Sequence, residues 1–174
     1  PLCYTEKGWK FMAPGSPRPL YGLDWLAARP NAHVAVFEGA KCADYAHERV
    51  AQVCVSWQGG VNSVGYADWS PLAGKRVTLC RDSDGPGWKC MEWLGNHLQK
   101  LGCRVFWAVN PDGWPKGGDV ADSGWGAEDL GKYLREAVPF ANRGDNPHVV
   151  AVVEPVAAVK PPAIEEKYGA LQMT

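Results

Sequence analysis

Four acidic residues stand after short apolar runs of the sequence, where a carboxylate can meet a substrate. Glu38 is followed by a glycine, and a single serine separates Asp82 from Asp84. Asp119 lies in a later glycine-rich loop. Carboxylates that gather at one place repel one another unless a cation lies between them, and hard oxygen ligands suit a Mg²⁺ ion that also holds a phosphate. This pattern predicts metal-dependent chemistry on a phosphate group.

The elements that must position these acids follow from the hydrophobic pattern. Short apolar runs predict buried strands, and apolar residues at spacings of three and four predict helices between them. Strands joined by helical crossovers form a parallel sheet with helices on both faces. We therefore expect an α/β fold, a Rossmann-like parallel sheet of about four strands, with ligands bound at the carboxyl ends of the strands. The expected strands are 33–37, 52–57, 76–80 and 103–109, and the expected helices are 41–51, 88–101 and 127–138.

The composition excludes several classes of protein. The 174 residues carry 18 Lys and Arg against 19 Asp and Glu, so any polyanion must be held by a local patch rather than a global basic field. No apolar run is long enough to span a membrane, and no charged-then-apolar leader opens the chain. Six scattered cysteines without a Cys-x-x-Cys pair predict buried thiols in a reducing cytoplasm, not disulfides or a zinc site.

The ends of the chain differ from its middle. Prolines gather near both ends, and because the chain opens on Pro1 and not on Met, we expect a piece of a longer protein. The length suits one domain with short appendages. We expect an N-terminal extension over 1–30, a catalytic core over 31–125, a C-terminal helix within 126–145 and a Pro-rich tail or linker over 146–174.

Two stretches of the sequence together resemble the TOPRIM domain. Residues 36–39 (Val-Phe-Glu-Gly) follow the first expected strand, and residues 82–87 (Asp-Ser-Asp-Gly-Pro-Gly) follow the third. That domain is shared by bacterial-type primases, type IA and II topoisomerases, OLD-family nucleases and recombination mediators. The resemblance covers about residues 17–138. Within the family, this chain is similar to the TOPRIM segments of phage- and plasmid-type primase or primase-helicase proteins. The segments that carry this narrower similarity are 19–23, 38–44, 59–60 and 68–74.

The resemblance implies roles for the acids. In that family the glutamate, here Glu38, is the general acid or base of phosphoryl or nucleotidyl transfer, and the Asp-x-Asp pair, here Asp82 and Asp84, binds Mg²⁺. Asp119 matches a further acidic position of primase-type members and is a third expected metal ligand, with Asp122 as the second choice. Mg²⁺ is the expected cofactor, and Mn²⁺ is its alternative.

Basic residues and glycines near the acids are candidates for binding the substrate. Lys41 opens a helix just after Glu38, where it can reach a phosphate, and the two form the expected catalytic pair. A solvated lysine of the first helical turn is the alternative for Lys41. Glycines let the backbone approach a ligand closely, although a plain tight turn explains them equally well. The expected nucleotide- or nucleic-acid-binding residues are Gly39, Gly59, Gly60, Arg81 and Lys89.

Nine tryptophans raise the question of base stacking. Trp57 and Trp107 lie in expected strands and are assigned to the core. Trp114 and Trp125 lie in the loop beside the expected site. These two are the stacking candidates, and anchoring the loop is their alternative role.

Together these features favour the TOPRIM catalytic domain of a DNA primase that makes primers in phage or plasmid replication. The expected partners are a single-stranded DNA template, nucleoside triphosphates, and the helicase and zinc-binding domains of a longer chain, with no membrane. A TOPRIM-type nuclease and a nucleic-acid-binding module with a vestigial metal site stay open as alternatives. Ala40 stands where related primase-helicase segments often have a second acid, which leaves open whether metal binding is weakened.

Overall fold

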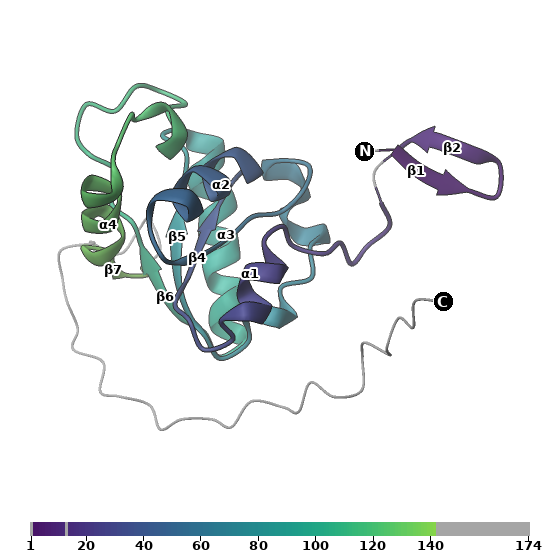
Figure 1. Ribbon diagram of the computed structural model, residues 1–174, viewed down its shortest axis with the longest axis horizontal. Helices are drawn as coiled ribbons and strands as arrows, with labels where there is room; N and C mark the ends of the chain where they lie inside the picture. The colour runs from purple at the N-terminus through teal and green to yellow at the C-terminus, as the bar shows by residue number, and fades with distance from the viewer. Residues whose placement is uncertain (1, 13, 142–174) are drawn as a thin grey trace.

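Five strands form the main sheet of the molecule (Figure 1). The structure is a computed structural model that describes residues 2–12 and 14–141. The strands are β3 (Val34–Phe37), β4 (Val53–Val55), β5 (Arg76–Cys80), β6 (Arg104–Trp107) and β7 (Val138–Pro139). Their order across the sheet is β4-β3-β5-β6-β7. The first four strands are parallel, and β7 pairs antiparallel with β6. Four parallel strands agree with the sequence-based prediction.

The strands of this sheet are buried on both sides, as their continuous apolar runs predict. In β3, Val34 and Val36 belong to one apolar cluster, whereas Ala35 and Phe37 belong to the other. Successive side chains of a strand point to opposite faces, so a strand that is apolar at every position needs a covering layer on each side.

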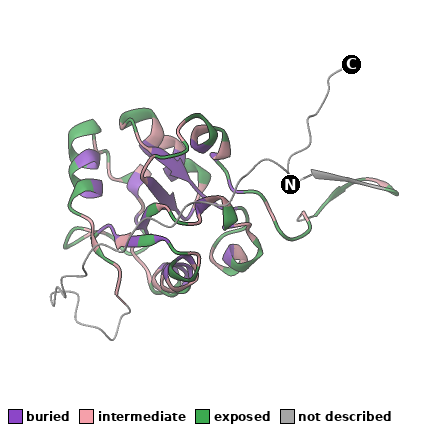
Figure 2. Cartoon of the chain, turned by 90° about the horizontal axis from the view of Figure 1, so that it is seen from below, coloured by how far each residue is buried: buried purple, intermediate pink, exposed green. Residues whose placement is uncertain are grey.

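Helices supply both covering layers, and Figure 2 shows that their buried residues face the sheet. The first face is covered by α1 (Leu23–Ala28), α3 (Gly85–Lys100) and the 3₁₀ turns η1 (Val61–Tyr66) and η2 (Ser70–Leu72). The second face is covered by α2 (Ala40–Arg49), α4 (Ala127–Arg135) and the 3₁₀ turn η3 (Val120–Asp122). The predicted Rossmann-like α/β architecture, with helices on both faces, is confirmed.

Helix α3 begins earlier than its hydrophobic pattern indicates. Met91, Leu94 and Leu98 are fully buried, as their spacing of three and four predicts. The helix nevertheless starts at Gly85 and not near residue 88, because Asp84 caps it and a proline occupies its first turn. The start of α3 therefore lies directly beside the acidic motif.

The end of the domain differs from the predicted helix over 127–138 and from the longer helical segment expected within 126–145. Helix α4 ends at Arg135, and Val138 pairs with Trp107 in the sheet. Pro139 follows, and the residue before a proline is disfavoured in helical conformation. The predicted extension of this helix to residue 138 is therefore wrong, since Val138 belongs to an added edge strand.

The N-terminal 30 residues have two parts. Strands β1 (Leu2–Thr5) and β2 (Gly8–Phe11) form an antiparallel hairpin that stands apart from the main sheet (Figure 1). Residues 18–28 are instead tied to the sheet, since Tyr21 and Ser56 exchange backbone hydrogen bonds of 2.9 and 3.3 Å. Leu20 and Leu26 are buried in the first-face cluster.

The expected tail over 146–174 lies outside the described residues. Within residues 2–12 and 14–141, no helix has the length and apolar character needed to cross a membrane.

Candidate functional site

The carboxyl ends of β3 and β5 lie side by side and carry predicted site residues. The two strands are parallel neighbours, and Phe37 is paired with Cys80 at the end of the ladder. Glu38 directly follows β3, and Asp82 follows β5 after one intervening residue. The sheet thus joins two acidic residues that are 44 positions apart in the sequence, and their contact is a direct hydrogen bond.

Glu38 is a buried carboxylate held by the backbone. Only 9% of the residue is exposed, and its Oε1 accepts a hydrogen bond from the Asp82 backbone N–H at 2.9 Å. Burial raises the pKa of Glu38 to about 7; that hydrogen bond opposes the rise, and the charges of Asp82 and Asp84 add to it. A group with a pKa near neutrality can both accept and release a proton, as general acid–base catalysis requires.

Gly87 leaves open the space that Glu38 occupies. A Cβ atom at this position would collide with Glu38 Oε1 and would lie 3.0 Å from Asp84 Oδ1. The Gly87 N–H donates to Asp84 Oδ1 at 2.6 Å, which caps helix α3. Gly87 is not among the residues predicted for the site. Its sequence signal is the second glycine of the Gly-Pro-Gly that follows the acidic pair.

Asp82 is half-buried and lies among other negative charges. The pKa of Asp82 is raised to about 6, chiefly by burial and also by the charges of Asp119 and Asp84. The positive charge of Lys41 lowers the pKa of Asp82. The three predicted metal ligands, Asp82, Asp84 and Asp119, therefore share one electrostatic environment.

The donor chemistry of this edge suits Mg²⁺. This ion prefers hard oxygen ligands and binds through one or two carboxylates, while water and substrate phosphates complete its coordination. Among the described residues, no group of three or more His, Cys, Asp or Glu side chains is arranged to hold a metal ion. Asp82 and Asp84 offer carboxylate oxygens, which are hard donors of the kind that Mg²⁺ binds.

Lys41 lies between two aspartates. Its Nζ is 3.1 Å from Asp119 Oδ2 and 2.8 Å from Asp122 Oδ1. Hydrogen bonds to Asp122 and Asp119 raise the pKa of Lys41, and Lys41 in turn lowers the pKa of Asp122. The Lys41 side chain is 62% exposed, so this contact is a surface ion pair. The predicted phosphate-binding lysine is thus paired with a predicted metal ligand.

Backbone hydrogen bonds tie the loop that carries Asp119 to the acidic motif. The Ser83 N–H donates to the Gly118 carbonyl at 3.0 Å, and the Gly117 N–H donates to the Ser83 carbonyl at 3.1 Å. Asp119 then caps η3 by accepting from the Asp122 N–H at 2.9 Å. These bonds explain how a residue after β6 comes close to residues after β5.

Two further residues support this edge and are not among the predicted ones. Asn110 Nδ2 donates to the Arg81 carbonyl at 3.2 Å, next to the acidic motif. Asn110 Oδ1 accepts a hydrogen bond of 2.9 Å from the buried hydroxyl of Tyr133 in α4. Neither residue belongs to a local motif, so no sequence signal marks them.

Three predicted substrate-binding residues border the acids. Gly39 is the N-cap residue that precedes α2 and is extended, and a Cβ there would meet open space. The Arg81 guanidinium lies 4.6 Å from the ring centroid of Trp88, a cation–π contact, and Nη1 donates to the Asp82 carbonyl at 3.2 Å. Lys89 is exposed on the second turn of α3.

The other two predicted glycines form the turn that leads into η1. Gly59 and Gly60 have φ values of +96° and +68°, which L side chains rarely adopt. Trp57 Nε1 donates to the Gly60 carbonyl at 2.8 Å and anchors this turn to the core. The conformational requirement alone accounts for both glycines.

The tryptophans considered in the sequence analysis fall into two groups, one in the core and one in the loop that carries Asp119. Trp57 and Trp107 are buried in the core, as predicted. Trp114 and Trp125 stack on each other with ring centroids 5.2 Å apart, and both contact the Tyr133 ring. Their mutual packing anchors the loop. The five cysteines whose side chains are described are all buried free thiols, as predicted: Cys42, Cys54, Cys80, Cys90 and Cys103.

Fold and site together define an α/β domain with an acidic edge at the carboxyl ends of its parallel strands. No family model and no curated protein matches the sequence. Among solved structures, the chain is similar to the crystal structure of the Aquifex aeolicus primase, zinc-binding and RNA polymerase domains. The TM-score is 0.53 at 18% sequence identity, over 70% of this chain and 30% of that chain. The chain thus spans less than a third of that protein, and the likeness is one of fold.

Proposed function

We propose that this chain is the TOPRIM catalytic domain of a DNA primase and carries out Mg²⁺-dependent nucleotidyl transfer on a DNA template. The observation that carries the proposal is the contact between Glu38 and the backbone of Asp82, because it joins the two sequence motifs of that resemblance at one edge of the sheet. Single-stranded template and nucleoside triphosphates are the proposed substrates. Helicase and zinc-binding domains of a longer chain are the proposed partners.

The fold supports this proposal independently of the motifs. The similar solved structure is a primase, and the likeness covers 70% of this chain. In an open α/β sheet, ligands bind outside the carboxyl ends of the strands, which is where the acidic motifs lie. Fold and motifs thus favour the same edge of the sheet.

The proposed reaction joins a 3′-hydroxyl oxygen to the α-phosphorus of a nucleoside triphosphate and releases pyrophosphate. Glu38 takes the hydroxyl proton, and its fixed hydrogen bond to the Asp82 N–H orients the carboxylate. Asp82 and Asp84 would hold Mg²⁺, which would supply charge neutralisation at the phosphates. The exposed Lys41 is free to exchange its aspartate partners for a phosphate, because surface ion pairs are weak.

The test is incorporation of labelled nucleotide on a single-stranded template with Mg²⁺, for the wild type and the variants Glu38→Gln and Asp82→Asn/Asp84→Asn. Asp112→Asn is the matched control, because this exposed aspartate lies in the same loop as Asp119 but outside the acidic cluster. We expect transfer by the wild type and the control, and a loss of about 100-fold or more in the other two. Template degradation would instead support a nuclease.

One observation favours a second candidate, a nucleic-acid-binding module without turnover. The Lys41 ammonium already neutralises Asp119, which the resemblance makes a metal ligand. Calorimetric titration with Mg²⁺ separates the two functions. Saturable binding that disappears in Asp82→Asn/Asp84→Asn supports the enzyme, and oligonucleotide binding without metal binding or turnover supports the module.

A further inference from the structure

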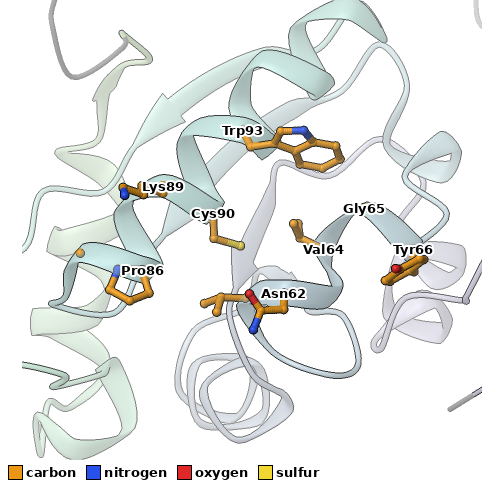
Figure 3. Close-up of a pocket in the computed structure, with 10 residues that line it drawn as sticks. Asn62, Val64, Gly65, Tyr66, Pro86, Lys89, Cys90 and Trp93 are labelled. Atoms are coloured by element: carbon orange, nitrogen blue, oxygen red, sulfur yellow. The ribbon is translucent and has the colours of Figure 1, made fainter.

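A groove runs between η1 and the first half of α3, on the sheet face opposite α2 and α4 (Figure 3). Its volume is about 760 Å³. It is open to solvent along its length and large enough for more than one base-sized group. The lining residues that carry the inference are Asn62, Tyr66, Pro86, Lys89, Cys90 and Trp93.

Two aromatic rings of the groove are partly exposed, and one of them, Trp93, stacks on the His97 ring with centroids 5.2 Å apart. Tyr66 is 51% exposed and Trp93 is 45% exposed. They come from opposite walls, one from the end of η1 and the other from α3 (Figure 3). Exposed aromatic faces are the platforms on which single-stranded nucleic acids stack their bases, because every base offers a flat π surface.

Cations accompany these rings. Lys89 lines the groove, and the Arg18 guanidinium lies 4.8 Å from the centroid of the Tyr66 ring. None of the ten described residues that line the groove is acidic. Cations beside aromatic rings match a chain of phosphates and bases, whereas a protein partner would call for a continuous apolar surface.

The groove opens next to the acidic edge. Gly85 and Pro86, which line it, are the first residues of α3 and follow Asp84 directly. The Cys90 thiol in the groove lies close enough to the acids for the charges of Glu38 and Asp82 to act on it. A strand lying in the groove would therefore lead to the carboxylates at the end of β3 and β5.

We propose that this groove binds single-stranded nucleic acid, with bases stacked on Trp93 and Tyr66 and phosphates held by Lys89 and Arg18. The proposal rests on the proposed function and gives the path by which a strand reaches the acidic edge. It assigns to the η1–α3 face a role in which the predicted binding residue Lys89 acts together with Trp93 and Tyr66, which the sequence did not mark.

The test is the affinity of the full chain for a fluorescently labelled oligothymidylate, measured by anisotropy in EDTA so that no transfer occurs. Trp93→Ala and Tyr66→Ala each remove one stacking platform, and we expect each to weaken binding about tenfold. Phe11→Ala is the matched control, because this ring is 90% exposed but lies in the N-terminal hairpin. The control is expected to bind as the wild type does.

The salt dependence of binding tests the phosphate contact separately. Lys89→Met is expected to reduce the slope of log affinity against log salt by about 0.7, the value for one lost contact with a single strand. Lys100→Met, at the other end of the same helix, is expected to leave the slope unchanged. Trp93→Phe retains a stacking ring and is expected to bind like the wild type, which guards against a folding defect in Trp93→Ala.

The outcomes separate this inference from the proposed function. Wild-type affinity and salt slope in all the groove variants would overturn the groove as the binding path, even if Glu38→Gln abolishes nucleotide transfer. If the groove variants bind more weakly but the wild-type chain transfers no nucleotide with Mg²⁺, the groove is supported as the binding site and the primase proposal is contradicted.

Discussion

The acidic edge has two halves that the fold holds in different ways. The inner carboxylates, Glu38, Asp82 and Asp84, are buried or half-buried, and Glu38 and Asp84 accept hydrogen bonds from backbone N–H groups. The outer ion pair joins the exposed Lys41 side chain to the half-buried Asp119 and to the exposed Asp122. The inner half is fixed by the backbone at the edge of the sheet and at the start of α3. The outer half is a contact at the surface between α2 and η3.

The two halves suit different steps, because proton transfer and ligand exchange need different surroundings. A buried carboxylate keeps its geometry and has its pKa raised, because the low dielectric disfavours its charge. An exposed ion pair is screened by salt and contributes little to stability, so an incoming phosphate or metal ion can displace it. The inner half thus suits the proton step and the outer half suits substrate entry.

The largest expected effect concerns the space beside Glu38. Gly87→Ala places a Cβ against Glu38 Oε1, so we expect a loss of stability of about 2 kcal/mol and a loss of transfer comparable to that of Glu38→Gln. Urea unfolding and nucleotide incorporation measure the two effects. Gly85→Ala is the matched control, because a Cβ there meets open space. A Gly87→Ala protein as stable and active as the control would show that the inner half is not rigid.

The next effect is the pH dependence of stability. The pKa of Glu38 rises from 4.5 to about 7 on folding, so its favourable contribution is complete below pH 4.5 and is lost as the pH rises through 7. Gln has no charge to bury. We therefore expect Glu38→Gln to gain about 2 kcal/mol relative to the wild type between about pH 5 and pH 8.

Urea unfolding at the two pH values measures this change, with Asp112→Asn as an exposed control. A parallel pH response of the wild type and Glu38→Gln would contradict the buried environment of Glu38.

The smallest effect concerns the outer ion pair. Lys41→Met removes the cation beside Asp119, so we expect Mg²⁺ to bind a few-fold more tightly while the unfolding midpoint stays unchanged. The difference between variant and wild type is expected to shrink at high salt, because the pair is exposed. Calorimetric titration at two salt concentrations measures it, with Lys100→Met as control. A large fall in stability would mean that the outer half is structural and not exchangeable.

Local patterns in the sequence determined much of the architecture. The apolar runs at 33–37 and 76–80 became β3 and β5, and the buried stripe of Met91, Leu94 and Leu98 became the inner face of α3. These patterns suffice because hydrophobic periodicity is set by residues that are neighbours in the sequence. The order of the acids after the strands likewise indicated one edge of a parallel sheet.

Only the tertiary structure decided which distant groups meet. The partners of Lys41, the collision that requires Gly87, the burial of Glu38 and the groove between η1 and α3 depend on elements that are far apart in the chain. The edge strand β7 and the short helix α1 were missed for the same reason: their positions are set by packing against the sheet and not by a periodic pattern of their own. Sequence spacing places residues along each element, whereas packing between elements sets the distances on which chemistry depends.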